Sequence, residues 1–277
     1  MPHHTDPATA GAEPPEALQR FSAADLQLHT AHGDGMADAR ALLDHVELRT
    51  DLDVIAVTDH DDIRGALRAR ELHAQHPYPF EFVPGIELTT RAGHILGLWV
   101  EEPLRPFRPL AESIAAVHRA GGLVVIPHPF SYLTRSVGQR ALEQLLAAAD
   151  PETLPDGIEI ANQTPAGRVT GARARRAKRE RYHLAETGGS DAHFLEEVGA
   201  SRTLFVGRTA AELRAAIKAR ATQGVFAYPV SLRAIGVRRL AAQQVRGLAV
   251  TPRKVLGPPL GRFGSRVRGR LGARSQP

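Results

Sequence analysis

The chain has 277 residues, of which 43% are hydrophobic, and a formal net charge of +5. This length and composition suit one large globular domain or two ordinary ones. The sequence has no cysteine, which excludes disulfides and thiolate metal sites, so a metal ion would be held by His, Asp, Glu or Gln. No stretch approaches the ~20 apolar residues of a transmembrane segment, and residues 1–20 lack the apolar core of a signal peptide, so we expect a cytoplasmic protein.

The positive charge is concentrated near the C-terminus. Residues 226–277 contain eleven Arg or Lys and no Asp or Glu, which leaves a net charge of −6 on residues 1–225. This segment is rich in Gly and Pro, a composition that does not favour a core of its own, so we expect it to be poorly ordered. A second basic run spans residues 168–181. We therefore expect a flexible N-terminal arm over 1–23, a folded domain over 24–225 and a basic C-terminal extension over 226–277.

Short apolar or β-branched runs alternate with helix-like stretches through the middle of the chain. Segments such as 37–50 and 108–122 place apolar residues three and four apart, as amphipathic helices do. Alternation of this kind indicates a parallel sheet with crossover helices, and seven or eight repeats close most economically into a barrel. An open doubly wound sheet is the alternative. The strand-like runs are 25–29, 52–58, 80–88, 94–100, 122–128, 157–162, 185–189 and 203–206.

The first of these runs, DLQLH, has the alternation of a strand with one polar face. Asp25, Gln27 and His29 are two residues apart and should share one face, whereas Leu26 and Leu28 should share the other. A solvated edge strand would also account for a single histidine at such a position. The polar face becomes informative only when the other strand ends are considered.

Histidines or carboxylates follow nearly every apolar run, in QLHTAHGD, TDHDD, GIEL, PHP, EIAN and GGSDAH. In a barrel the strand ends meet at one rim, where active sites lie. Each residue alone has a plainer explanation: Asp59, Asp61 or Asp191 could cap a helix, His94 could be an ordinary half-buried histidine, and His128 could be a turn residue. Burying so many ionisable groups together is costly unless they are paired or hold metal ions, and nitrogen and oxygen ligands suit Zn, Mn or Fe.

The motifs DLxxHT…GDG, TDHD, PGIE, H-x-x-G, PHP and GGSDAH, in this order, resemble the PHP (polymerase and histidinol phosphatase) family of metal-dependent phosphoesterases over roughly residues 24–225. The resemblance implies a distorted (β/α)7 barrel whose strand ends hold two or three divalent metal ions, Mn, Zn or Fe. It also implies three metal positions. They are formed by His29, Glu87 and Asp191, by Glu87, His94 and His128, and by Asp34, His60 and His193.

Gln27 departs from the family pattern, because the family usually has the first histidine of an HxH pair at this position. Glutamine offers a neutral carbonyl oxygen, which is a poorer ligand for Zn or Fe than imidazole. Either the first ion is still bound with Gln27 as a weak or absent ligand, or the protein works with the other two ions, or the site has lost activity. We favour the first two, because eight of the nine ligand positions match the family.

The resemblance implies that a phosphate ester is hydrolysed by a metal-bound hydroxide. Glu87 is then the expected bridging ligand, and His193 or a metal-bound water would protonate the leaving group. Arg135, seven residues after His128, is a candidate phosphate anchor because a guanidinium can donate to two oxygens, although a solvated loop arginine is the alternative. The basic segments favour a nucleotide, a nucleoside bisphosphate or an oligonucleotide end as substrate over a small metabolite phosphate.

The basic extension suggests a further contact with nucleic acid or with an anionic membrane surface. Residues 232–250 could form an amphipathic basic helix of the kind that lies on anionic lipid. A non-catalytic, phosphate-binding or regulatory module on the same barrel also stays open, because a fold alone does not determine an activity.

Overall fold

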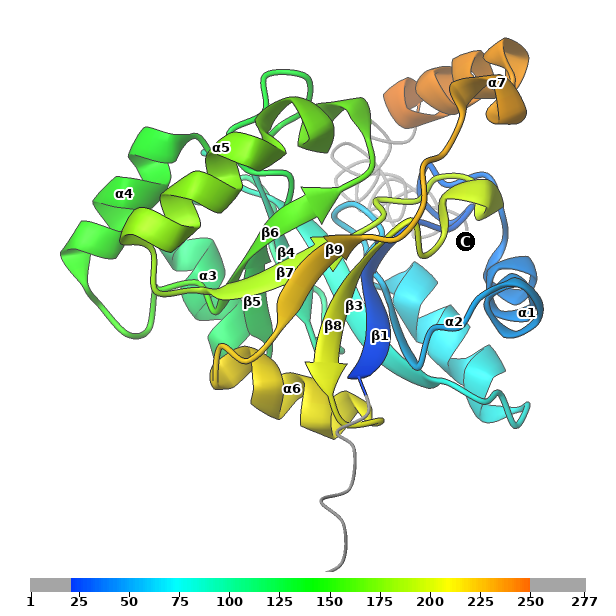
Figure 1. Ribbon diagram of the computed structural model, residues 1–277, viewed down its shortest axis with the longest axis horizontal. Coiled ribbons are helices and arrows are strands. Elements are labelled where there is room, and N and C mark those ends of the chain that lie inside the picture. The colour runs from blue at the N-terminus through cyan, green and yellow to red at the C-terminus, as the bar shows by residue number, and fades with distance from the viewer. Residues whose placement is uncertain (1–20, 250–277) are drawn as a thin grey trace, which may run out of the picture.

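A nine-stranded sheet, curved into a nearly closed barrel, forms the centre of the computed structural model, which describes residues 21–249 (Figure 1). Helices α1 and α2 cover one flank of the sheet and α3, α4 and α5 cover the other. The predicted arm, up to residue 20, and residues 250–277 of the predicted extension lie outside the described residues. The strands are β1 (Phe21–Leu28), β2 (Val54–Val57), β3 (Glu81–Thr89), β4 (His94–Leu98), β5 (Leu123–Ile126), β6 (Gly157–Asn162), β7 (Ala185–Gly189), β8 (Ser201–Val206) and β9 (Gln223–Phe226).

The helices alternate with these strands over most of the chain, as the spacing of apolar residues predicts. Helix α5 begins with Thr164, whose side chain accepts from the Gly167 amide, and with a proline in its first turn, both typical of a helix start. The helices are α1 (Ala39–Arg49), α2 (Arg64–Ala74), α3 (Leu110–Arg119), α4 (Gln139–Ala148), α5 (Pro165–Arg181), α6 (Ala210–Lys218) and α7 (Leu232–Ile235), with a further helix over 237–249. None of the described helices is long and apolar enough to cross a membrane.

The strand order across the sheet is β7-β6-β5-β4-β3-β2-β1-β8-β9, so the predicted barrel is confirmed and all eight predicted strand runs are present. The expectation of a uniformly parallel sheet was wrong. Strand β4 runs antiparallel to both β3 and β5, and β8 runs antiparallel to both β1 and β9. The connection between β3 and β4 is only four residues, 90–93, which is too short for the crossover that a parallel pair needs.

The β3–β4 hairpin determines where His94 lies. In the antiparallel register Thr89 pairs with His94 and Glu87 pairs with Leu96. His94 therefore begins a strand at the same rim where the parallel strands end. Because β4 runs antiparallel to β3, the histidine at its start lies beside the residues at the ends of the parallel strands.

Strand β1 does not keep the strict alternation that its sequence predicts. A register shift against β2 lies between Asp25 and Leu28, as at a β-bulge. Leu26 consequently packs in the interior cluster with Val54, whereas Leu28 packs in the outer cluster with Val57. Leu26 and Leu28 do not share a face, which corrects the expectation from alternation.

The barrel closes where β7 approaches β8 and β9. The Thr203 hydroxyl donates to the Gly188 carbonyl (2.9 Å) and accepts from the Gly188 amide (2.9 Å). A Cβ at Gly188 would lie 2.5 Å from the Arg202 carbonyl oxygen, so only glycine allows this approach. A backbone bridge between Leu28, at the end of β1, and Ala192, which follows β7, also contributes to the closure.

The barrel interior is apolar at one end and polar at the other. The interior apolar cluster includes Leu26, Val54 and Leu98, together with Leu213 and Ile217 of α6, which covers the lower end of the barrel in Figure 1. Because this end is filled by aliphatic side chains, polar side chains of the interior are confined to the opposite rim. The predicted strand-end residues lie at that rim.

Candidate metal centre

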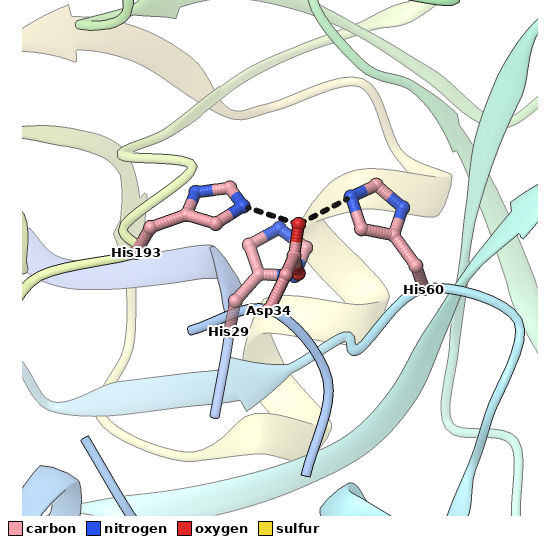
Figure 2. Close-up of side chains that lie close together, drawn as sticks. All are labelled: His29, Asp34, His60 and His193. Carbon is pink, nitrogen blue, oxygen red and sulfur yellow. Dashed lines mark hydrogen bonds and ion pairs between the residues drawn. The ribbon is translucent and has the colours of Figure 1, made fainter. Parts of the chain in front are cut away.

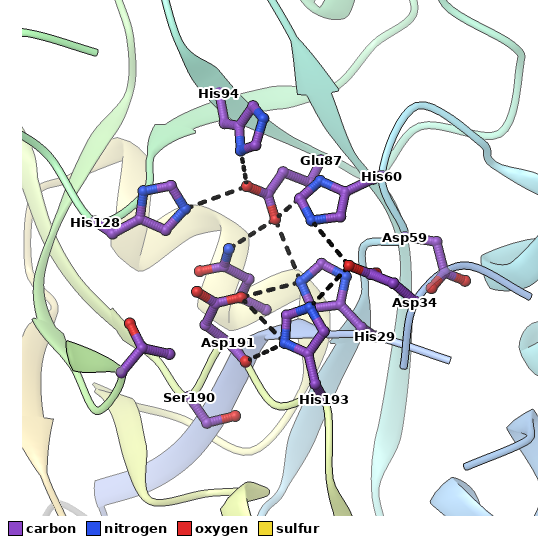
Figure 3. Close-up of polar contacts among 12 residues, drawn as sticks. His29, Asp34, Asp59, His60, Glu87, His94, His128, Ser190, Asp191 and His193 are labelled. Atoms are coloured by element: carbon purple, nitrogen blue, oxygen red, sulfur yellow. Dashed lines mark hydrogen bonds and ion pairs between the residues drawn. The ribbon is translucent and has the colours of Figure 1, made fainter. Parts of the chain in front are cut away.

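Glu87, near the end of β3, is the centre of a buried polar cluster (Figure 3). Its Oε1 atom lies 2.7 Å from His94 Nδ1 and 3.2 Å from His128 Nε2. Its Oε2 atom accepts from Gln27 Nε2 (2.8 Å) and lies 3.3 Å from His29 Nε2. The two oxygens of one carboxylate therefore face two different groups of side chains, as a carboxylate that bridges two ions would.

Burial by itself would raise the pKa of Glu87, since it disfavours the charged form. The charges of His60 and His94 and the hydrogen bonds from His128 and His29 instead hold this pKa well below its ordinary value. Burial lowers the pKa of His128, but the hydrogen bond and the charge of Glu87 outweigh it and raise that pKa to about 9. Glu87 is thus an ionised carboxylate surrounded by histidines.

Asp34 is the centre of the second half of the cluster (Figure 2). Its Oδ2 atom lies 3.3 Å from His193 Nε2 and 3.9 Å from His60 Nε2, and the His29 ring stacks on that of His193 with centroids 4.3 Å apart. Burial would raise the pKa of Asp34, but the hydrogen bond and charge of His193 and the charge of His60 lower it strongly. This half is only partly buried, so it is the side from which solvent reaches the cluster.

Asp191 connects the two halves through His29. Its Oδ1 atom lies 3.1 Å from His29 Nε2, the same nitrogen that faces Glu87. Asp191 has a φ of 56°, in the left-handed region that a non-glycine residue adopts only when its surroundings impose it. The preceding Ser190 is held by Asp25, which accepts from its amide (3.0 Å) and its hydroxyl (2.5 Å).

The two aspartates of the TDHD motif orient the loops around His60. Asp59 accepts from the amide and the hydroxyl of Thr30, both at 2.7 Å, and so fixes the loop that follows β1. Asp61 accepts in the same way from the amide (2.6 Å) and the hydroxyl (2.7 Å) of Thr89 at the end of β3. The helix-cap alternative does not hold, because α2 starts at an Ile63 N-cap that makes no side-chain cap bond.

Glu159 is a buried carboxylate that the sequence did not single out. It is 2% exposed and accepts from the His128 amide (2.6 Å) and from Asn162 Nδ2 (2.8 Å), while Ser136 Oγ contacts His128 Nδ1 (2.8 Å). Burial raises the pKa of Glu159 to about 8. These contacts turn His128 Nε2 toward Glu87. The sequence feature that could have identified Glu159 is its position as a charged residue inside the apolar run 157–162.

Three groups of side chains bring their ligand atoms within 4.8 Å of one another. Among the described residues, three buried atoms of this cluster have neither a hydrogen-bond partner nor an ion-pair contact: Gln27 Oε1, His29 Nδ1 and Asp34 Oδ1. Unpaired buried acceptors next to clustered imidazoles and carboxylates fit divalent ions that prefer nitrogen and oxygen. The groups are His29 with Asp34, His60 and His193; His60 with Glu87 and His94; and His29 with Glu87 and Asp191.

The structure therefore brings eight predicted ligands and Gln27 together at one rim. The grouping differs from the expected one in two respects: His29 joins the Asp34 group, and His60 joins Glu87 and His94. His128 still lies 3.2 Å from Glu87. Arg135, the predicted phosphate anchor, is exposed, and in the part of the chain that the structure describes its guanidinium lies over the Phe107 ring at 5.6 Å.

Comparisons with known proteins agree with this geometry. A family model described as PHP-associated matches residues 172–222. The chain is 29% identical to an uncharacterised protein of Methanocaldococcus jannaschii over 150 residues, which are 50% of this chain and 81% of that protein. A two-domain protein from Bacteroides vulgatus that contains a predicted PHP-like metal-dependent phosphoesterase superposes with a TM-score of 0.60 at 17% identity, over 85% of this chain and 75% of that one.

The resemblance to the PHP family is confirmed. The stretch matched by the PHP-associated model includes Asp191 and His193 of the cluster. A lesion-specific endonuclease from Pyrococcus furiosus is similar in fold to this chain, with a TM-score of 0.51 at 15% identity over 74% of this chain and 58% of that one. At such identities the structural similarities concern the fold, and the chemistry of this chain has to be argued from its own residues.

Proposed function

We propose that this protein is a metal-dependent phosphoesterase that hydrolyses a phosphate ester of a nucleotide, a nucleoside bisphosphate or an oligonucleotide end. The observation that carries the proposal is Glu87, a fully buried carboxylate whose two oxygens face separate groups of histidines. Such an arrangement suits adjacent divalent ions, because imidazole nitrogens and carboxylate oxygens converge on both sides of Glu87 and are the ligands that Zn, Mn and Fe prefer.

Two or three divalent ions, Zn, Mn or Fe, would be held by this cluster. When bound, such ions lower the pKa of water to about 7 and neutralise the charge of a phosphate. The contribution of the chain is to orient its ligands: Glu159 holds the backbone of His128, and Asp59 and Asp61 hold the loops on either side of His60. The proposed ligands are His29, Asp34, His60, Glu87, His94, His128, Asp191 and His193, with Gln27 as a weak ligand.

His193 is the proposed proton donor to the leaving group. Its Nδ1 atom donates to the Asp191 backbone carbonyl (2.9 Å), which directs Nε2 toward Asp34 and the open side of the cluster. Burial and the charge of His29 lower the pKa of His193, but Asp34 and Asp191 outweigh them and raise it. When His193 does not hold an ion, its Nε2 atom can carry the proton that the leaving group takes up.

Arg135 is the proposed phosphate anchor. It precedes Ser136, whose hydroxyl contacts His128, and its own carbonyl accepts from the His94 amide (2.8 Å). Its loop is thus attached to two proposed ligands while its guanidinium remains exposed.

A nucleotide or nucleic-acid substrate is supported by the distribution of charge. Helix α5 carries seven basic residues over 168–181, and residues 226–277 carry no acid. Arginine and lysine beside phosphates bind with a salt dependence that reflects counterion release. We propose that the extension contacts nucleic acid, with an anionic membrane surface as the second candidate on account of the helix over 237–249.

A substrate screen tests the proposal. Full-length protein supplied with Mn²⁺, Zn²⁺ or Fe²⁺ is assayed for phosphate release from nucleotides, nucleoside bisphosphates, short RNA, sugar phosphates and an aryl phosphodiester, with Glu87→Gln as the matched inactive variant. We expect hydrolysis of a nucleotide-containing substrate that Glu87→Gln abolishes. Metal-loaded protein that cleaves no substrate would instead support a phosphate-binding module without turnover.

A further inference from the structure

A separate pocket of about 490 Å³ lies between the first half of α5 and the residues that follow β9. Its volume is within the range of about 300–1,000 Å³ that is typical of small-molecule sites. The side chains that give it chemical character are Gln163, Arg168, Arg175, Phe226 and Tyr228. None of them belongs to the metal cluster, and the proposed hydrolysis does not require them.

The pocket contains hydrogen-bond donors that the fold leaves unused. Gln163 is only 7% exposed, yet its Nε2 atom has no hydrogen-bond partner within residues 21–249. Arg168 is exposed and has no ion-pair partner in the same range. Buried polar groups are nearly always paired, so an unpaired amide that lines a pocket indicates a ligand that accepts a hydrogen bond.

Two exposed aromatic rings form the other wall of the pocket. Phe226 is 43% exposed and Tyr228 is 39% exposed, although both are large apolar rings. The Tyr228 hydroxyl donates to the Val198 carbonyl, which fixes its ring, and the Arg175 guanidinium lies 5.9 Å from the centroid of Phe226. Aromatic rings beside guanidinium groups are the combination on which nucleobases stack.

The pocket is attached to the metal cluster on both sides. On the α5 side, Thr170 Oγ1 donates to the carbonyl of Pro129 (2.8 Å), the residue after His128. On the β9 side, the Ala227 amide donates to the Ala200 carbonyl (2.9 Å), in the segment that follows Asp191. The pocket therefore lies between two of the loops that form the metal centre.

The direction of β9 places its end at the same rim as the cluster. Strand β9 is antiparallel to β8, and β8 is antiparallel to β1, so β9 runs in the direction of β1 (Figure 1). Phe226 ends β9 and Gln163 follows the end of β6, so both lie at the rim where β1 presents His29. The pocket and the metal centre therefore lie at the same rim of the barrel.

We propose that this pocket binds one nucleotide unit of the substrate next to the phosphate ester held at the metal centre. The base stacks against Phe226 and Tyr228, Gln163 donates to a carbonyl or ring nitrogen of the base, and Arg168 binds a phosphate of the same unit. This inference rests on the proposed phosphoesterase function and names its substrate class. A sugar phosphate without a base would make no stacking contact with the two aromatic rings and should bind more weakly.

Equilibrium binding tests the inference without turnover. Full-length protein without added metal is titrated with adenosine 5′-phosphate and with ribose 5-phosphate. We expect the nucleotide to bind at least tenfold more tightly, and Arg168→Ala and Phe226→Ala each to weaken it at least tenfold. Arg179→Ala is the matched control, because it removes the same charge from α5 about 16 Å further along the helix. It should leave the affinity unchanged.

Equal affinities for the two ligands, or unchanged nucleotide binding in Arg168→Ala, would overturn the inference. Hydrolysis of an aryl phosphodiester by metal-loaded protein separates this failure from failure of the proposed function. If wild type and Arg168→Ala hydrolyse the aryl ester alike while nucleotide binding is unaffected, the pocket assignment is wrong and the phosphoesterase stands. If the wild type hydrolyses nothing, the function fails, and the titration still decides the pocket.

Discussion

Gln27 allows the metal assignment to be tested at a single residue. The side chain is fully buried, its Nε2 atom donates to Glu87 Oε2 at 2.8 Å, and its Oε1 atom has no partner among the described residues. An unsatisfied buried acceptor costs about 1–3 kcal/mol. If an ion accepts this oxygen as a ligand, the same free energy is recovered on binding, and it corresponds to about 5- to 150-fold in affinity.

The test compares Gln27→Met, which keeps the approximate shape but removes both the oxygen and the Nε2 donor to Glu87, with Gln27→His, which supplies an imidazole. We expect Gln27→Met to weaken one ion by about 5- to 150-fold, and Gln27→His to tighten it by at least about tenfold because imidazole is a better ligand. Calorimetric titration of metal-free protein with Zn²⁺ or Mn²⁺ measures the affinities, elemental analysis counts the ions, and circular dichroism verifies the fold. If both variants bind the same number of ions as the wild type, with affinities within about twofold, Gln27 does not face an ion.

Three further changes test other parts of the structure. Asp59→Ala removes two hydrogen bonds to Thr30 and should lower the free energy of unfolding by about 2–4 kcal/mol in urea titrations; a loss below about 0.5 kcal/mol would mean that the β1 loop is held by other contacts. The hydrogen bond to Asp156 raises the pKa of His118 in the folded protein. The protonated histidine therefore stabilises the fold by about 0.5–1 kcal/mol. This contribution is complete below the unfolded-state pKa near 6.5 and is lost as the pH rises through the folded-state pKa. His118→Gln should flatten this pH dependence of stability, and an unaltered slope would assign it to other groups. Gly188→Ala should lower the thermal midpoint by several degrees, since its Cβ would meet backbone 2.5 Å away, and an unchanged midpoint would show that β7 and β8 can separate without cost.

The local pattern of the sequence was sufficient to predict the alternating strands and helices and the residues that lie at one rim of the barrel. Every apolar run between residues 25 and 206 became a strand, because burial on both faces favours continuous β-branched and aliphatic runs. His29, Glu87 and Asp191 could be assigned to one cluster from the order of short motifs. The ends of barrel strands lie at one rim whatever conformation the connecting loops adopt.

Other features depended on contacts between segments that are distant in sequence. The bulge that separates Leu26 from Leu28 is a matter of register against β2, and periodicity within one strand carries no information about its partner. Strand β9 has exposed or half-exposed residues and so lacks the apolar pattern of the other strands. It forms because glycine at position 224 lets its backbone pass close to that of β7.

The supporting carboxylates Asp25 and Glu159 likewise became meaningful only in three dimensions. Each lies in an ordinary strand sequence, and each accepts a hydrogen bond from a backbone amide of a loop that is distant in sequence. In the same way, the pocket beside α5 brings together Gln163 and Phe226, which are 63 positions apart in the sequence. The sequence by itself determined which side chains reach the rim, because that follows from local periodicity. Closure of the sheet decided what holds them there, since hydrogen bonds across the barrel exist only once its edges meet.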